Sequence, residues 1–158
     1  MNKWILGARP RTLPAAIAPV VVAVAIAYPT FNFINAILAL IVGLALQIAV
    51  NYANDYSDGV KGTDAERVGP TRLVASGLAS AAEVKQAAIT AFGIGGVAGL
   101  YLSIRTSYWL IAIGAAAIIA AWRYTGGKNP YGYRGLGEVY VFIFFGLVAT
   151  IGTYYGQT

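Results

Sequence analysis

The chain alternates long apolar stretches with short polar connections. A helix needs about 17–25 mainly apolar residues to cross the hydrocarbon core of a membrane. Five stretches approach or meet this length, at residues 12–28, 33–52, 82–102, 108–122 and 139–155. The pattern predicts an all-α fold class, a polytopic membrane helix bundle of about five transmembrane helices that forms a single membrane domain over residues 1–158.

The first stretch differs from the others at its start. Pro14 and Pro19 predict a kinked or unwound entry, which a bundle tolerates because its neighbours satisfy the freed backbone groups. A basic segment before a short apolar stretch is also typical of a cleaved secretory signal. Because four further apolar stretches follow, we interpret it as an uncleaved first span.

The composition is typical of a membrane protein, and it limits which residue types could act in catalysis or bind a metal. Hydrophobic residues make up 58% of the chain and charged residues 11%, whereas soluble domains carry about 25% charged residues. The chain has no Cys and no His, which excludes disulfides, thiolate or histidine zinc sites, and Ser-His or Cys-His catalysis. The remaining candidates for chemistry are carboxylates, amides, Tyr, Lys, Arg and a bound metal.

Basic residues are distributed unevenly among the connections. Arg105 alone lies between the third and fourth stretches; the other ten precede the first stretch or lie near the connections after the second and fourth, at Lys3, Arg9, Arg11, Lys61, Arg67, Arg72, Lys85, Arg123, Lys128 and Arg134. The positive-inside rule predicts that this side is cytoplasmic, in the cell (plasma) membrane. The net charge of +5 then reflects topology, so we expect no nucleic acid partner.

The second stretch ends in a polar motif, N-Y-A-N-D-Y-S-D-G-V-K-G-T-D, at residues 51–64. If the helix continues through it, Asn51, Asp55 and Asp58 lie on one side. The two carboxylates repel each other, and they lie at the negative end of the helix dipole and near hydrocarbon. A hard cation would remove these penalties, since Mg²⁺ binds one or two carboxylates together with water and phosphate oxygens. The motif therefore favours a magnesium site.

Basic residues follow this motif closely. Lys61, Arg67 and Arg72 could hold the remaining negative charge of a diphosphate. The alternative is a polar turn at the membrane exit, in which the acids of the motif pair with these same bases. For Lys61 and Arg72, the general positive-inside bias is an equally good explanation.

Three segments resemble the UbiA-type intramembrane prenyltransferases. They are the motif above with Lys61, Asp64 and Arg72 downstream, the loop Y-T-G-G-K-N-P-Y-G-Y-R-G-L-G-E at 124–138, and the opening A-R-P-R-T-L-P-A at 8–15. Together they most resemble the branch that prenylates 1,4-dihydroxy-2-naphthoate in menaquinone biosynthesis. The similarity extends through nearly the whole chain.

The resemblance implies a prenyltransferase in which Asp55 and Asp58 are catalytic. Asn51, Asp55 and Asp58 would hold Mg²⁺, which bridges to a polyprenyl diphosphate and stabilises the departing diphosphate. An aromatic acid acceptor would then take the prenyl group and lose its carboxylate. The residues implied in substrate binding are Lys61, Asp64, Arg72, Arg11, Tyr124 and Tyr131. The apolar helices, surrounded by membrane lipid, would form a tunnel for the prenyl tail.

Several alternatives stay open. Tyr124, Tyr131 and Tyr133 fit an interfacial tyrosine belt as well as an acceptor site. Lys128 stands where this branch commonly has Pro, so another aromatic acceptor is an alternative. The family has about nine spanning helices and a second aspartate-rich motif, so the resemblance implies the N-terminal part of such an enzyme, inactive by itself. A non-catalytic membrane assembly or binding module and a transporter fragment are the rival functions.

Overall fold

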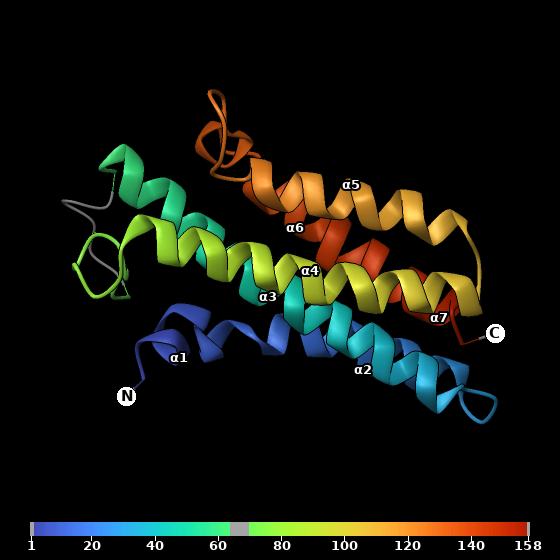
Figure 1. The fold of residues 1–158 in the computed structure, drawn as a ribbon. Helices are drawn as coiled ribbons and strands as arrows, with labels where there is room; N and C mark the ends of the chain where they lie inside the picture. The colour runs from blue at the N-terminus through green and yellow to red at the C-terminus, as the bar shows by residue number, and fades with distance from the viewer. Residues whose placement is uncertain (1, 64–69, 158) are drawn as a thin grey trace.

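The computed structural model describes residues 2–63 and 70–157, and in these ranges all regular secondary structure is helical, which confirms the all-α fold class. The elements are α1 (Lys3–Ala8), η1 (Pro10–Thr12), α2 (Pro14–Ala27), α3 (Phe33–Lys61), α4 (Ala81–Arg105), α5 (Trp109–Arg123), η2 (Tyr131–Arg134), α6 (Gly137–Val141), the π-helical segment η3 (Phe142–Val148) and α7 (Ala149–Tyr155) (Figure 1). Two residues named above, Asp64 and Arg67, lie outside the described ranges.

Three helical stretches are long and apolar enough to cross a membrane: α3, α4 and the continuous stretch Gly137–Tyr155. The first expected span is broken, since Lys3–Thr12 and Pro14–Ala27 meet at 48°, and together they make a fourth candidate. This bend agrees with the kinked start that the prolines predict. The remaining expected span corresponds to α5, an apolar helix of 15 residues, shorter than a typical spanning helix.

Local signals in the sequence explain where the two longest helices begin and where α3 ends. The side chain of Asn32 accepts a hydrogen bond from the Asn35 amide at the start of α3. Ser80 and Glu83 form a capping box at the start of α4. Gly62 ends α3 with φ at +71°, a left-handed conformation that glycine adopts without strain.

α3 and α4 pack along each other through small residues. A Cβ placed on Gly95 would lie 3.4 Å from the Ala45 Cβ and from the Leu46 Cδ2, and one on Gly99 would lie 3.6 Å from a Val42 methyl group. The G-x-x-x-G pattern of α4 therefore serves close packing within the chain. Buried alanines of both helices, including Ala49, Ala53, Ala88 and Ala91, form the core beside it.

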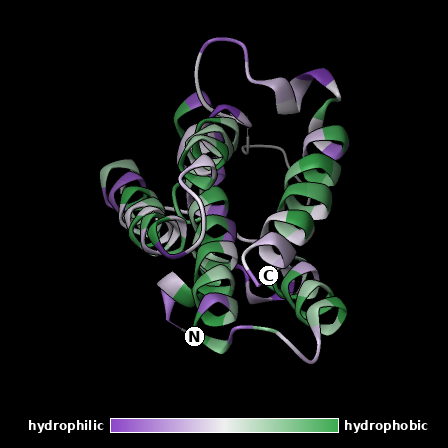
Figure 2. Ribbon diagram, turned by 90° about the vertical axis from the view of Figure 1, so that its right-hand side faces the viewer, coloured by the Kyte–Doolittle hydropathy of each residue, from purple (hydrophilic) through white to green (hydrophobic). Residues whose placement is uncertain are grey.

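The polar segments gather at one end of the bundle. Figure 1 shows the N-terminus, the end of α3, the connection 70–80 and the loop 124–136 at this end, and the C-terminus at the other. Figure 2 shows that hydrophobic colouring dominates the helices. The uneven distribution of basic residues along the sequence thus becomes a difference between the two ends of the molecule.

The opposite end is held together by a small polar network. The Arg105 Nε donates to the Asn35 Oδ1 at 2.9 Å, and the Asn35 Nδ2 donates to the Gly156 carbonyl at 2.7 Å. The Gln157 Oε1 accepts from the Asn32 amide at 3.1 Å. These bonds connect the start of α3 to the end of α4 and to the end of the described chain. Arg105 therefore helps to hold these segments together.

Candidate active site

The helix α3 continues through the polar motif to Lys61, as the sequence predicts. Asn51, Asn54, Asp55 and Asp58 all lie in its last turns, and all four are buried. They share one side of the helix, and their side chains contact three other parts of the chain: the opening segment, the connection 70–80 and the loop 124–136. The motif therefore joins several segments of the chain, in addition to being a group of polar side chains that could bind a metal or substrate.

Asp55 is 0% exposed, and its carboxylate faces the connection 70–80. The Oδ2 accepts a hydrogen bond from the Leu73 amide at 2.8 Å, and the Oδ1 accepts one from the Val74 amide at 3.1 Å. Both oxygens of the carboxylate thus bind consecutive backbone N–H groups. Hydrogen bonds with an ionised acceptor are about twice as strong as neutral ones, so this contact holds the connection against α3.

Asp58 forms a buried ion pair. Its Oδ2 lies 3.2 Å from the Arg72 Nη2, and the exposed fractions of the two side chains are 5% and 8%. The Tyr133 hydroxyl donates a hydrogen bond to its Oδ1. The pairing of acids with bases of the following connection, the alternative to a magnesium site in the sequence, is therefore found for Asp58 and Arg72.

Asn51 connects α3 to the bend in the first span. Its Nδ2 donates to the Ala8 carbonyl and to the Thr12 Oγ1, each at 2.9 Å. The Gln47 Nε2, one turn earlier on α3, donates to the same Thr12 oxygen at 3.1 Å. The opening segment of the chain, which carries part of the family resemblance, is thus fixed beside the polar motif. Arg11 lies in the same segment and is exposed.

The loop 124–136 covers another part of α3. The Thr125 hydroxyl donates to the Asn54 Oδ1 at 2.8 Å, and the Lys61 Nζ donates to the Thr125 carbonyl at 2.5 Å. The Lys61 ammonium also lies 5.1 Å from the centre of the Tyr133 ring, a cation–π distance. Tyr133 therefore contacts the polar motif itself. Its contact shows that two loops far apart in sequence converge on the end of α3.

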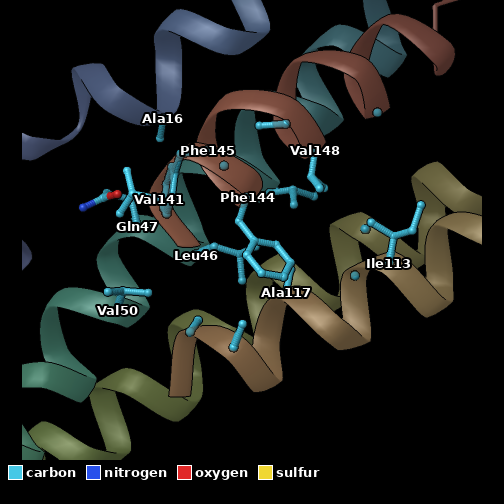
Figure 3. A pocket seen from close by; sticks show the side chains of 18 of the residues that line it. Ala16, Leu46, Gln47, Val50, Ile113, Ala117, Val141, Phe144, Phe145 and Val148 are labelled. Atoms are coloured by element: carbon cyan, nitrogen blue, oxygen red, sulfur yellow. The ribbon is translucent and has the colours of Figure 1, made fainter. Parts of the chain in front are cut away.

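An apolar cavity of about 400 Å³ begins beside this junction. Small aliphatic and aromatic residues of α2, α3, α5 and η3 form most of its wall. In Figure 3 the ring of Phe144 points toward Ala117 and Ile113 of α5. Gln47, Asn51 and Asn54 are among the polar residues of the lining, together with Tyr124 and Tyr131. The cavity thus has an apolar body and a polar group of residues near the motif.

Stacked aromatic rings line one side of this cavity. Tyr131 stacks on Tyr140 with ring centres 3.8 Å apart, and Tyr124 meets Tyr131 edge-on at 5.5 Å. Tyr140 also stacks on Phe144 at 6.1 Å. The sequence singles out Tyr124 and Tyr131 but misses Tyr140 and Phe144, because they lie in what reads as an ordinary apolar span. The sequence feature that could have identified Tyr140 and Phe144 is their spacing of four residues, which places both rings on one helix face.

Burial, together with the neighbouring Tyr140 and Tyr124, raises the pKa of the Tyr131 phenol to about 12. The phenol is therefore neutral at physiological pH, and it donates to the Ala120 carbonyl at 2.8 Å. Because the folded-state pKa lies above the ordinary value of 10.0, its contribution to stability is complete below pH 10 and is lost as pH rises toward 12.

We expect the difference in unfolding free energy between the wild type and Tyr131→Phe to be constant below pH 10 and to shrink between pH 10 and 12. Thermal unfolding in detergent across this range measures it. Tyr108→Phe, at an exposed tyrosine, is the control. A difference that stays constant up to pH 12 would show that Tyr131 titrates normally.

Residues 16–158 match the UbiA prenyltransferase family. The chain belongs to this family. It is 55% identical to the 1,4-dihydroxy-2-naphthoate octaprenyltransferase of Mycobacterium tuberculosis, over 98% of this chain and 54% of that protein. It is 40% identical to the enzyme of the same name from Escherichia coli, over 98% of this chain and 53% of that protein.

The chain spans about half the length of the curated relatives it matches. No solved structure matches it. Membership of the UbiA family, together with the spanning helices, makes this an integral membrane protein. The resemblance that the three sequence segments carry is confirmed at the level of the family.

UbiA-family prenyltransferases generally depend on a divalent metal. Within residues 2–63 and 70–157, no group of three or more acidic, Cys or His residues is close enough to hold a metal. Asn51 and Asn54 border the cavity, and Asp58 lies one turn beyond Asn54 on the same face. These three fit an ion that takes oxygen ligands. Neither Asp55 nor Asp58 lines the cavity. Asp55 fits less well than Asp58, because both oxygens of its fully enclosed carboxylate bind backbone amides, whereas Asp58 is bonded to side chains that can move.

Proposed function

We propose that the protein transfers a polyprenyl group from polyprenyl diphosphate to an aromatic acid, 1,4-dihydroxy-2-naphthoate, in menaquinone biosynthesis. The observation that carries the proposal is the cavity, whose apolar body ends at the polar motif of α3. Such a shape suits a substrate with a hydrocarbon tail and a doubly charged head. The identity of the acceptor rests on the relatives, several of which bear this activity in their names.

In this proposal the prenyl tail occupies the apolar body of the cavity. The diphosphate lies near Asn51 and Asn54, with positive charge supplied by Lys61 at the end of α3 and by Arg72 in the connection 70–80. Asp58 holds Arg72 in place through the buried ion pair. Mg²⁺ bound at Asn51, Asn54 and Asp58 would add positive charge that stabilises the leaving diphosphate.

The reaction then breaks the allylic C–O bond, and the diphosphate leaves with the electron pair. The electron-rich ring of the acceptor attacks the allylic carbon, a new C–C bond forms, and the carboxylate is lost as CO₂. The aromatic faces of Tyr124, Tyr131 and Tyr140 line the cavity where positive charge develops, and such faces attract cations. The apolar wall keeps out water that would otherwise capture the cation.

The direct test is transfer of a labelled polyprenyl diphosphate to 1,4-dihydroxy-2-naphthoate in nanodiscs with Mg²⁺. The protein assayed is the chain extended with the remainder of its Mycobacterium tuberculosis relative, since the chain spans 54% of that protein. We expect a prenylated naphthalene product whose formation stops when EDTA is added. Product with another aromatic acid, such as 4-hydroxybenzoate, but none with the naphthoate would overturn the proposed acceptor. Absence of transfer to any aromatic acid would overturn the proposed activity.

We also propose that the protein lies in the plasma membrane with its polar end in the cytoplasm. The positive-inside distribution supports this orientation. A cysteine introduced at Phe31 should react with a membrane-impermeant thiol reagent from outside the cell, and one at Lys128 only after the membrane is opened. The chain has no native Cys to interfere. The reverse pattern of labelling would contradict the orientation.

A further inference from the structure

We infer that Asp55 is a positioning residue for diphosphate binding: it holds the connection 70–80 against α3 and thereby sets Arg72 beside Asp58. This inference rests on the proposed function for its effect on the substrate. It differs from the role that the resemblance implies, in which Asp55 binds the metal directly. The distinction can be tested because the two roles respond differently to the same variants.

The first observation is the contact of Asp55 itself. Its carboxylate is fully enclosed, and its two oxygens accept from the amides of Leu73 and Val74. These two residues follow Arg72 directly, so the backbone next to Arg72 is fixed at two consecutive positions. The Arg72 carbonyl accepts from the Ser76 amide at 3.0 Å and from the Ser76 hydroxyl at 2.5 Å. The turn that carries Arg72 is therefore anchored to α3 on one side and closed on itself on the other.

The second observation is independent of charge: two glycines leave room for the side chains of the anchored residues. A Cβ on Gly59 of α3 would lie 2.5 Å from the Val74 Cγ1 and 2.6 Å from its Cβ. A Cβ on Gly7 of α1 would lie 2.6 Å from the Leu73 Cδ1. Leu73 is 0% exposed. The connection is thus fitted closely against α1 and α3, and any added atom at Gly59 must move it, because the Val74 Cβ moves only with its backbone.

These observations make Arg72 dependent on Asp55. The Arg72 guanidinium meets Asp58 at 3.2 Å in a nearly solvent-free site, where a displacement of about 1 Å has a large effect on function. If the connection moves away from α3, Arg72 moves with it and no longer faces Asp58. The positive charge beside the proposed diphosphate site is then misplaced, although every group expected to bind metal is still present.

The experiment compares Asp55→Asn and Gly59→Ala with a control, Gly96→Ala, in the chain reconstituted in nanodiscs. Gly96 is also helical, but a Cβ there meets nothing within 4 Å. Hydrogen exchange of the segment 70–80 reports whether the connection is anchored. Binding of a non-cleavable allylic diphosphate analogue is then measured over a range of Mg²⁺ concentrations. It gives the affinity and, separately, the Mg²⁺ concentration at half-maximal binding.

We expect both variants to speed exchange in the segment 70–80 by about tenfold or more and to weaken analogue binding by about tenfold, with the half-maximal Mg²⁺ concentration unchanged. Normal exchange in Asp55→Asn would overturn the inference. So would a large shift in the Mg²⁺ requirement for Asp55→Asn with a fully normal Gly59→Ala, because that pattern identifies a metal ligand. If the wild type binds no analogue, the proposed function fails, and the exchange data still decide whether Asp55 anchors the connection.

Discussion

Asp58→Ala is expected to abolish analogue binding and prenyl transfer and to destabilise the protein. The substitution removes the Asp58 carboxylate from the Arg72 guanidinium in a site where Arg72 is 8% exposed, and it also removes the Asp58 oxygen to which the Tyr133 hydroxyl donates. Breaking a buried ion pair by removing one partner typically costs about 3–5 kcal/mol. Unfolding in detergent, followed by tryptophan fluorescence, measures the stability, and the transfer assay measures the activity.

The double variant Asp58→Ala with Arg72→Met separates the two effects of Asp58. Because both members of the buried ion pair are then removed, we expect it to recover most of the lost stability but none of the binding or activity. Glu138→Ala, at an exposed carboxylate, should be close to wild type in both measurements. An active Asp58→Ala protein would contradict the role proposed for this residue.

Ala117→Phe is expected to weaken the binding of long polyprenyl diphosphates strongly without loss of stability. Ala117 lines the cavity of about 400 Å³ and faces the ring of Phe144 (Figure 3). A phenyl ring added there occupies the space that the prenyl tail would need, and we expect an affinity loss of about hundredfold, since even one misplaced methylene in an apolar pocket changes binding by about 10–200-fold. Binding of a labelled long-chain analogue measures the effect.

A five-carbon allylic diphosphate provides the comparison for this variant, because its short tail leaves the body of the cavity unused. Its affinity should change little. Ala116→Phe makes the same change at the adjacent position, which is exposed on α5 and does not line the cavity, so it should bind both ligands normally. Equal loss of the long and short ligands in Ala117→Phe would show that the cavity does not hold the tail.

Much of the fold could be predicted from local sequence. The stretches that become α3, α4 and the last helical stretch are apolar over the length of a membrane span. The prolines of the first stretch predict the bend that the structure shows there. The continuation of α3 through Asn51 and Asp58 follows from their helical spacing. Since α5 is only 15 residues long, its expected place among the spans depends on the helices around it more than on its own length.

The sequence by itself determined the helices, the uneven distribution of charge and the presence of the polar motif, because each depends on neighbours within a few residues. Only the tertiary structure decided the partners of that motif: Asp55 binds the amides of Leu73 and Val74, and Asp58 meets both Arg72 and Tyr133. Helical periodicity places side chains on a face but does not say which distant segment packs there. Tyr133 is 75 residues from Asp58, and it reaches that carboxylate because the packing of the helices returns the loop 124–136 to the end of α3.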